Sequence, residues 1–156
     1  MKKFKNILFT FILLLLVISL TGCGNNKNIS GTLEEIMDKV YANIPEDQRP
    51  MMLMNTELTK ENVEIYLGTA DIEFEEGIAS ESATGSIAHS VVLLRVKDGA
   101  NVELIKEKIE NSVNPRKWIC VEAEEVEVES KGNLIILIMS SESNTEKIEN
   151  SFNNLK

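Results

Sequence analysis

The most constraining feature of this chain is a segment, residues 86–96, that becomes apolar at nearly every position towards its end. A strand with one buried face alternates apolar and polar residues, whereas a strand covered on both faces is apolar almost throughout. We therefore expect this segment to form a central strand covered on both faces. A second run, residues 134–139, is apolar throughout, and Gly132 and Asn133 before it are typical of a tight hairpin connection to residues 121–130.

Helical periodicity predicts helices around these strands. Thr32 and Glu35 have the spacing of a capping box, which starts a helix. The predicted helices cover residues 32–44, 59–68, 102–113 and 142–155, and the predicted strands cover residues 72–78, 86–96, 121–130 and 134–139. The resulting order ααββαββα, with strands in pairs, favours an α+β fold in which helices pack on one face of a mainly antiparallel sheet of about four strands.

The beginning of the chain has the pattern of a secretory signal. Lysines precede an apolar run over residues 7–20, which is shorter than the roughly 20 apolar residues that cross a bilayer. Leu20-Thr21-Gly22-Cys23 then resembles the lipobox of bacterial lipoproteins, in which the cysteine is lipidated and becomes the new N-terminus. An uncleaved anchor or a conventionally secreted form is the alternative.

These features predict three parts of the chain. Residues 1–22 form a lipoprotein signal peptide, residues 23–31 comprise the lipidated Cys23 and a polar tether, and residues 32–156 form a single extracytoplasmic domain. Cys23 would carry a diacylglyceryl group as a thioether, whose two acyl chains are of the palmitate type, and about two lipid signals hold a protein stably on a membrane.

The charge of the chain limits the classes of partner. Removing residues 1–22 takes away three lysines and no acidic residue, which changes the net charge from −9 to −12. This excess argues against nucleic acid and anionic lipid surfaces as partners. Basic proteins, peptides or cations remain open, as does a charge that serves solubility alone.

Three methionines, Met51, Met52 and Met54, are the candidate partner-binding residues. Clustered thioethers are ligands for Cu(I), but this segment has no neighbouring histidine. Flexible methionine side chains also form adaptable apolar contact surfaces on binding proteins, which is the reading we prefer to the copper site. The third alternative is that this loop plugs the core.

Cys120 and His89 provide the conventional nucleophile and base of the predicted domain. A cysteine and a histidine can form a nucleophilic pair, but the surrounding residues match no cysteine-hydrolase pattern. We expect His89 to lie on a strand and Cys120 to be packed and inert, because free cysteine is among the most buried residue types. No catalytic residue is assigned.

The acidic segment "EAEEVEVES" places Glu125, Glu127 and Glu129 on one face of a strand. Successive carboxylates on that face lie roughly 6.5 to 7 Å apart, too far for two of them to chelate one calcium ion directly. We expect a solvated face, and we assign no metal ligand and no cofactor.

Residues 32–152 resemble small exported bacterial lipoproteins of the family called domain of unknown function 4358. The resemblance rests on the order of elements and on four short motifs, namely Tyr66-Leu67-Gly68, Ile72-Glu73-Phe74-Glu75-Glu76, "VVLLRVKDG" and Lys131-Gly132-Asn133. It implies export and a single compact domain, and it implies no established activity.

Together these observations predict a non-enzymatic binding domain, lipid-anchored at the outer face of the cell membrane, whose partner is a membrane-proximal envelope protein. The alternative is an enzyme or cation-binding protein with a site built from scattered acidic residues. A shallow apolar patch around residues 51–54 would favour the first function. A basic, aromatic-lined cleft or a cluster of inward-facing carboxylates would favour the second.

Overall fold

The computed structural model describes residues 28–156. The predicted signal peptide, Cys23 and the first part of the predicted tether, residues 23–27, lie outside the described residues. Within residues 28–156, no helix combines the length and the apolar character needed to cross a membrane.

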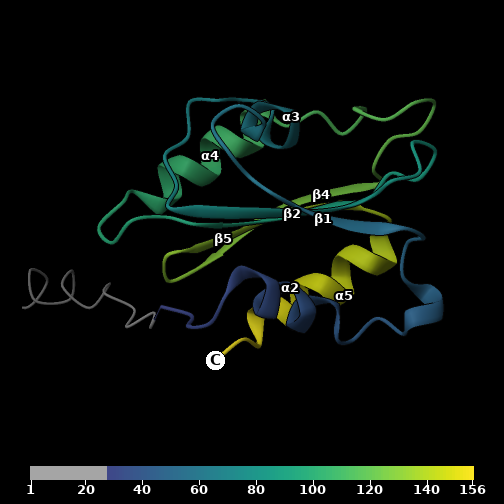
Figure 1. Ribbon diagram of the computed structural model, residues 1–156, viewed down its shortest axis with the longest axis horizontal. Coiled ribbons are helices and arrows are strands. Elements are labelled where there is room, and N and C mark those ends of the chain that lie inside the picture. The colour runs from purple at the N-terminus through teal and green to yellow at the C-terminus, as the bar shows by residue number, and fades with distance from the viewer. Residues whose placement is uncertain (1–27) are drawn as a thin grey trace, which may run out of the picture.

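In the described part of the chain, five strands form one antiparallel sheet in the order β1-β2-β3-β5-β4 (Figure 1). The strands are β1 (Leu53–Glu57), β2 (Glu76–Ser82), β3 (Ser90–Arg95), β4 (Glu125–Lys131) and β5 (Leu134–Ser140). The α+β class and the antiparallel sheet are confirmed, with one strand more than expected. β3 occupies the middle of the sheet, and only Arg95 at its end is not fully buried, as predicted for a strand covered on both faces.

The helices lie on both faces of this sheet, whereas the sequence predicted one face (Figure 1). They are α2 (Leu33–Tyr41) and α5 (Glu142–Asn153) on one face, and α3 (Val63–Leu67) and α4 (Val102–Ser112) on the other. The reason is that β3 and β5 direct apolar side chains to both sides. Leu93 and Ile136 enter the core under α2 and α5, while Val92 and Leu137 enter the core under α3 and α4. Both apolar surfaces must be removed from water.

The capping box predicted at the start of α2 is present. The backbone N–H of Glu35 donates to Oγ1 of Thr32 at 3.2 Å, and the backbone N–H of Thr32 donates to Oε2 of Glu35 at 3.2 Å. The side chains of Ile36 and Val40 are fully buried against the sheet. Local sequence therefore determines where this helix starts and which of its faces is buried.

Two differences concern the strands that precede β3. β1 forms in a segment that the sequence predicted as irregular, because its residues pair with the distant β2. β2 begins at Glu76, four residues after the predicted start, because Ile72 and Phe74 pack as part of a loop against the core under α3 and α4. A short run of alternating apolar residues fits a half-buried strand and a packed loop equally well.

Opposite ends of the sheet carry the beginning of the described chain and the methionine segment (Figure 1). Arg95, at the end of β3, donates to the carbonyl oxygens of Ile29 at 2.6 Å and Gly31 at 2.8 Å, and Asn28 Nδ2 donates to Asp98 Oδ1 at 2.9 Å. The methionines instead lie at the other end, near Ser90, since the neighbouring strand β2 pairs Glu81 with Ser90. The five residue steps from Ser90 to Arg95 separate these ends by about 17 Å.

Candidate functional site

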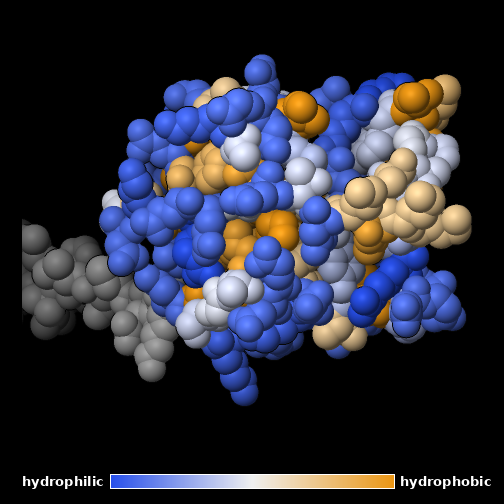
Figure 2. Space-filling model, viewed as in Figure 1, coloured by the Kyte–Doolittle hydropathy of each residue, from blue (hydrophilic) through white to orange (hydrophobic). Residues whose placement is uncertain are grey.

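Four large apolar side chains are exposed at the end of the sheet away from Arg95. Met51, Met52, Met54 and Ile119 are 67%, 66%, 60% and 75% exposed, and we call these four residues the methionine patch. Figure 2 shows hydrophobic residues gathered at this end of the molecule. The methionine loop therefore does not plug the core, which was one of the alternatives at the sequence level.

The backbone of the methionine patch is fixed although its side chains are exposed. Ser82 Oγ donates to the carbonyl oxygen of Met51 at 2.8 Å, and the N–H of Ala83 donates to that of Met52 at 3.0 Å. Met52 has a φ of 54°, in the left-handed region that non-glycine residues rarely adopt. The N–H of Ile119 donates to Gly85 in the β2–β3 loop, which brings Ile119 to the same end of the sheet. The side chains of the patch thus point outward from a main chain that is held by hydrogen bonds.

A polar and aromatic cluster borders the patch beside Met54. Met54 lies opposite Glu81 in the β1–β2 pairing, and Glu81 forms an ion pair with Lys117. The Lys117 ammonium also lies 5.1 Å from the ring centre of Tyr66 and 5.3 Å from that of Trp118. The charge of Lys117 is therefore balanced within the domain, and the rings of Tyr66 and Trp118 are half-buried against the core under α3 and α4.

His89 belongs to a different and buried arrangement. It directly precedes β3, not on the strand as predicted, and it is completely buried. Its Nε2 atom lies 2.7 Å from Oη of Tyr41, and its Nδ1 atom lies 2.7 Å from Oγ of Ser140. A neutral imidazole has one donor and one acceptor nitrogen, and either hydroxyl can take the complementary role. Sequence reasoning missed Tyr41 and Ser140 because both lie about fifty residues away along the chain.

Burial keeps this network uncharged. It raises the pKa of Tyr41 above its usual range and lowers the pKa of His89 to about 4. A serine bonded to a histidine is the pairing that activates a nucleophile, and a hollow of about 300 Å³ lies against it. However, His89 and Ser140 are 0% and 1% exposed, and the third group is a neutral phenol that cannot balance an imidazolium charge as a carboxylate does. The network joins α2 to the ends of β3 and β5.

Cys120 is exposed, so the prediction of a packed cysteine is wrong. The residue has a φ of 63° within the irregular segment between α4 and β4, and this turn directs the chain along the surface. Both ring nitrogens of His89 are held by Tyr41 and Ser140, which leaves neither nitrogen for Cys120. The structure therefore does not assemble the cysteine–histidine pair.

The acidic face of β4 is less solvated than expected. Glu125 is exposed, but Glu127 and Glu129 are partly buried. Partial burial, with the nearby carboxylates of Glu149, Glu129 and Glu125, raises the pKa of Glu127. Within residues 28–156, no group of three or more His, Cys, Asp or Glu side chains is placed to hold a metal ion.

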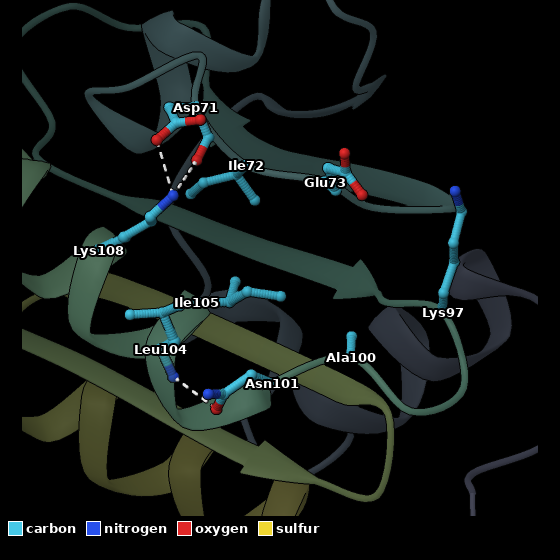
Figure 3. Close-up of a pocket in the computed structure, with 9 residues that line it drawn as sticks. All are labelled: Asp71, Ile72, Glu73, Lys97, Ala100, Asn101, Leu104, Ile105 and Lys108. Atoms are coloured by element: carbon cyan, nitrogen blue, oxygen red, sulfur yellow. Dashed lines mark hydrogen bonds and ion pairs between the residues drawn. The ribbon is translucent and has the colours of Figure 1, made fainter.

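A cleft of about 320 Å³ lies between α4 and the segment that leads into β2 (Figure 3). Its lining includes two carboxylates, Asp71 and Glu73, and both are exposed, whereas the alternative function would need a cluster of inward-facing acidic groups. Lys108 Nζ donates to Oδ2 of Asp71 at 2.7 Å and to its carbonyl oxygen at 3.2 Å, and this contact lowers the pKa of Asp71. Glu73 lies on the side of the cleft nearer Lys97 in Figure 3. The carboxylates of this cleft are thus accompanied by lysines instead of forming an acidic cluster.

Comparisons of the chain with protein-family models, with curated proteins and with solved structures find no match. The resemblance to the family called domain of unknown function 4358 therefore stays a prediction. Among the described residues, four of the six exposed large apolar side chains belong to the methionine patch.

Proposed function

We propose that this protein is a membrane-anchored lipoprotein whose extracytoplasmic domain binds a polypeptide partner through the methionine patch. The observation that carries the proposal is the exposure of Met51, Met52 and Met54 above a pinned backbone. Methionine side chains are unbranched and polarizable, so they adapt to different apolar surfaces. Contiguous exposed apolar residues with a polar border mark interaction sites on soluble domains.

The position of the patch supports a partner that approaches from the side away from the anchor. Arg95 holds the main-chain carbonyl of Ile29, so five residues separate Cys23 from the first residue whose main chain is held by the domain. The six residue steps from Cys23 to Ile29 span at most about 20 to 22 Å when fully extended. The domain stays close to the outer face of the membrane, and its methionine patch points away from the end at which the tether enters.

The negative charge supports the same arrangement. A net charge of −12 after removal of residues 1–22 opposes flat adsorption on anionic lipid. The repulsion is screened beyond about 8 Å at physiological ionic strength, so it acts when the domain approaches the lipid surface closely. We infer a partner among the envelope proteins near the membrane, reached at the membrane-distal end of the domain.

A photo-cross-linking scan of the full chain in intact cells tests this function. A photoreactive residue is placed at Met52 or Met54, and matched variants carry it at Ile65 or Leu104, which are exposed apolar residues outside the patch. We expect one discrete protein adduct from both patch positions and none from the two controls. Adducts of equal yield from all four positions, or none from the patch, would contradict the proposal.

The anchor needs its own control. Cys23→Ser should abolish lipid labelling and release the protein from the membrane fraction, because the thiol is the group that takes the lipid. If this variant is still labelled and retained, Cys23 is not the anchor. The cross-linking scan then has to be interpreted without a fixed distance from the membrane.

A further inference from the structure

The strand β1 forms one edge of the sheet, and its pairing determines which of its backbone groups are free. The carbonyl oxygen of Met52 accepts from Ala83, and the N–H of Leu58 donates to Gly77. In an antiparallel pair, every second residue bonds to the neighbouring strand. The backbone groups of Met54 and Thr56 therefore bond to β2, while those of Leu53 and Asn55 point away from the sheet.

These outward groups have no other partner among residues 28–156. The hydrogen bonds of this part of the chain include none to the backbone of Leu53 or Asn55, whereas the carbonyl oxygen of Glu57 accepts from Asn62 Nδ2 at 3.0 Å. The N–H and C=O groups of Leu53 and Asn55 thus offer four backbone hydrogen bonds to an added strand. Exposed edges of this kind are templates for pairing with another chain.

The two edges of the sheet differ in how they are protected. β4 carries Lys131 and three glutamates, and charged residues on an edge discourage pairing with other chains. β1 contains no lysine and no proline, and its single charge, Glu57, stands at its end. Its exposed central residues are Met54 and Asn55. The unprotected edge is therefore the one that continues into the methionine patch.

We infer that the partner binds as an additional strand along β1, and that the bound segment is an extended polypeptide with alternating apolar and basic residues. This inference rests on the proposed function and specifies how the partner is recognised. Peptides that add a strand gain affinity from main-chain hydrogen bonds and specificity from alternate side chains. One side of the added strand would lie beside Met54, and its basic residues would face a domain of excess negative charge.

Charge and register favour such a segment over a second copy of this chain. Antiparallel pairing of two β1 strands about Asn55 would place Leu53 of each copy opposite Glu57 of the other, setting an apolar side chain against a carboxylate. The two copies would also each carry a net charge of −12 after removal of residues 1–22. Like charges across an interface oppose association.

The first test measures amide hydrogen exchange in the full chain, in detergent, with synthetic nine-residue peptides. One peptide alternates valine and lysine, and the matched peptide alternates valine and glutamate. We expect the lysine peptide to slow exchange at Leu53 and Asn55 at least 10-fold and the glutamate peptide to leave both rates unchanged. Equal protection by both peptides, no protection at millimolar lysine peptide, or protection that depends on protein concentration alone would overturn the inference.

The second test changes the free edge without changing the sheet. The Asn55 N–H points away from β2, so Asn55→Pro removes an outward donor, and proline is tolerated at such edge positions. Asn55→Ala is the matched control that keeps the donor. We expect Asn55→Pro to lower the affinity for the lysine peptide at least 10-fold and Asn55→Ala to change this affinity less than 2-fold. The two variants should have similar melting temperatures. If both variants bind the lysine peptide with equal affinity, the inference that the partner pairs with β1 as an added strand is wrong.

The two proposals fail in distinguishable ways. If Asn55→Pro retains the cellular adduct formed from Met54, the partner uses the methionine patch without pairing to β1, and the proposed function stands. If no adduct forms from Met52 or Met54 in the unmodified chain, the proposed function itself is contradicted.

Discussion

The phenol oxygen of Tyr41 lies 2.7 Å from Nε2 of His89, and this contact joins α2 to the residue that precedes β3. Both side chains are buried, and the other ring nitrogen of His89 is held by Ser140. The imidazole therefore contributes to stability in its neutral form. A buried histidine of this kind makes folding depend on pH.

The first prediction concerns that dependence. The pKa of His89 is about 4 in the folded chain against about 6.5 when unfolded, so the unfolded state takes up a proton first as the pH falls. The contribution of neutral His89 to the free energy of unfolding is complete above about pH 6.5 and is lost between that value and about pH 4. At pH 5 the loss is about 2 kcal/mol. Urea unfolding at pH 7 and pH 5 should show this loss, and His89→Gln, which does not titrate, should show a decrease smaller by that amount. Equal decreases in the free energy of unfolding of the unmodified chain and of His89→Gln would contradict this prediction.

The second prediction uses a matched pair of glycines with positive φ. Gly68 (φ 74°) ends α3, and a Cβ there would lie 1.9 Å from the carbonyl oxygen of Ser112, whereas a Cβ on Gly99 (φ 81°) would meet nothing within 4 Å. Gly99→Ala should cost roughly 1 to 2 kcal/mol, the ordinary penalty of a left-handed conformation. Gly68→Ala should cost at least about 2 kcal/mol more, since backbone atoms must move. Urea unfolding measures both, and similar costs would show that α3 and α4 do not approach this closely.

The third prediction concerns the attachment of the N-terminal segment. Arg95 donates to the carbonyl oxygens of Ile29 and Gly31 and pairs with Glu76. Arg95→Ala should lower stability by about 1 to 3 kcal/mol and speed hydrogen exchange at the start of α2, because these contacts are lost together. Arg95→Lys keeps the charge but lacks the planar guanidinium group that reaches both carbonyls. It should therefore restore the stability and the slow exchange only in part. Unchanged exchange in Arg95→Ala would show that the segment is held by other contacts.

Local signals predicted several elements correctly. The capping box of Thr32 and Glu35 and the tight turn at Gly132 and Asn133 depend on residues close together in the sequence, and both occur in the structure. The apolar run towards the end of residues 86–96 also indicated a strand covered on both faces, and this signal contained the information that helices lie on both sides. The order of paired strands alone does not decide between one covered face and two.

Features made by distant residues were not predictable in the same way. β1 is a strand because it pairs with β2, and its own residues follow Pro50 and read as irregular. The network around His89 joins residues that lie 48 and 51 positions away. The exposure of Cys120 follows from a turn with positive φ, which its residue type does not favour. The methionines were predicted as a contact surface from composition, but their position opposite the N-terminal segment required the fold.

The most direct test of the central claim makes the methionine patch polar while leaving the fold intact. With the photoreactive residue at Ile119, the combined change of Met51, Met52 and Met54 to Ser is compared with Ile65→Ser, a polar change at an equally exposed apolar residue outside the patch. Both variants should keep a free energy of unfolding within about 0.5 kcal/mol per substitution of the unmodified chain, because the altered side chains are exposed. We predict that the triple variant loses at least 10-fold in adduct yield and that Ile65→Ser changes it less than 2-fold. An adduct yield that is unchanged in the triple variant would contradict the binding function assigned to this patch.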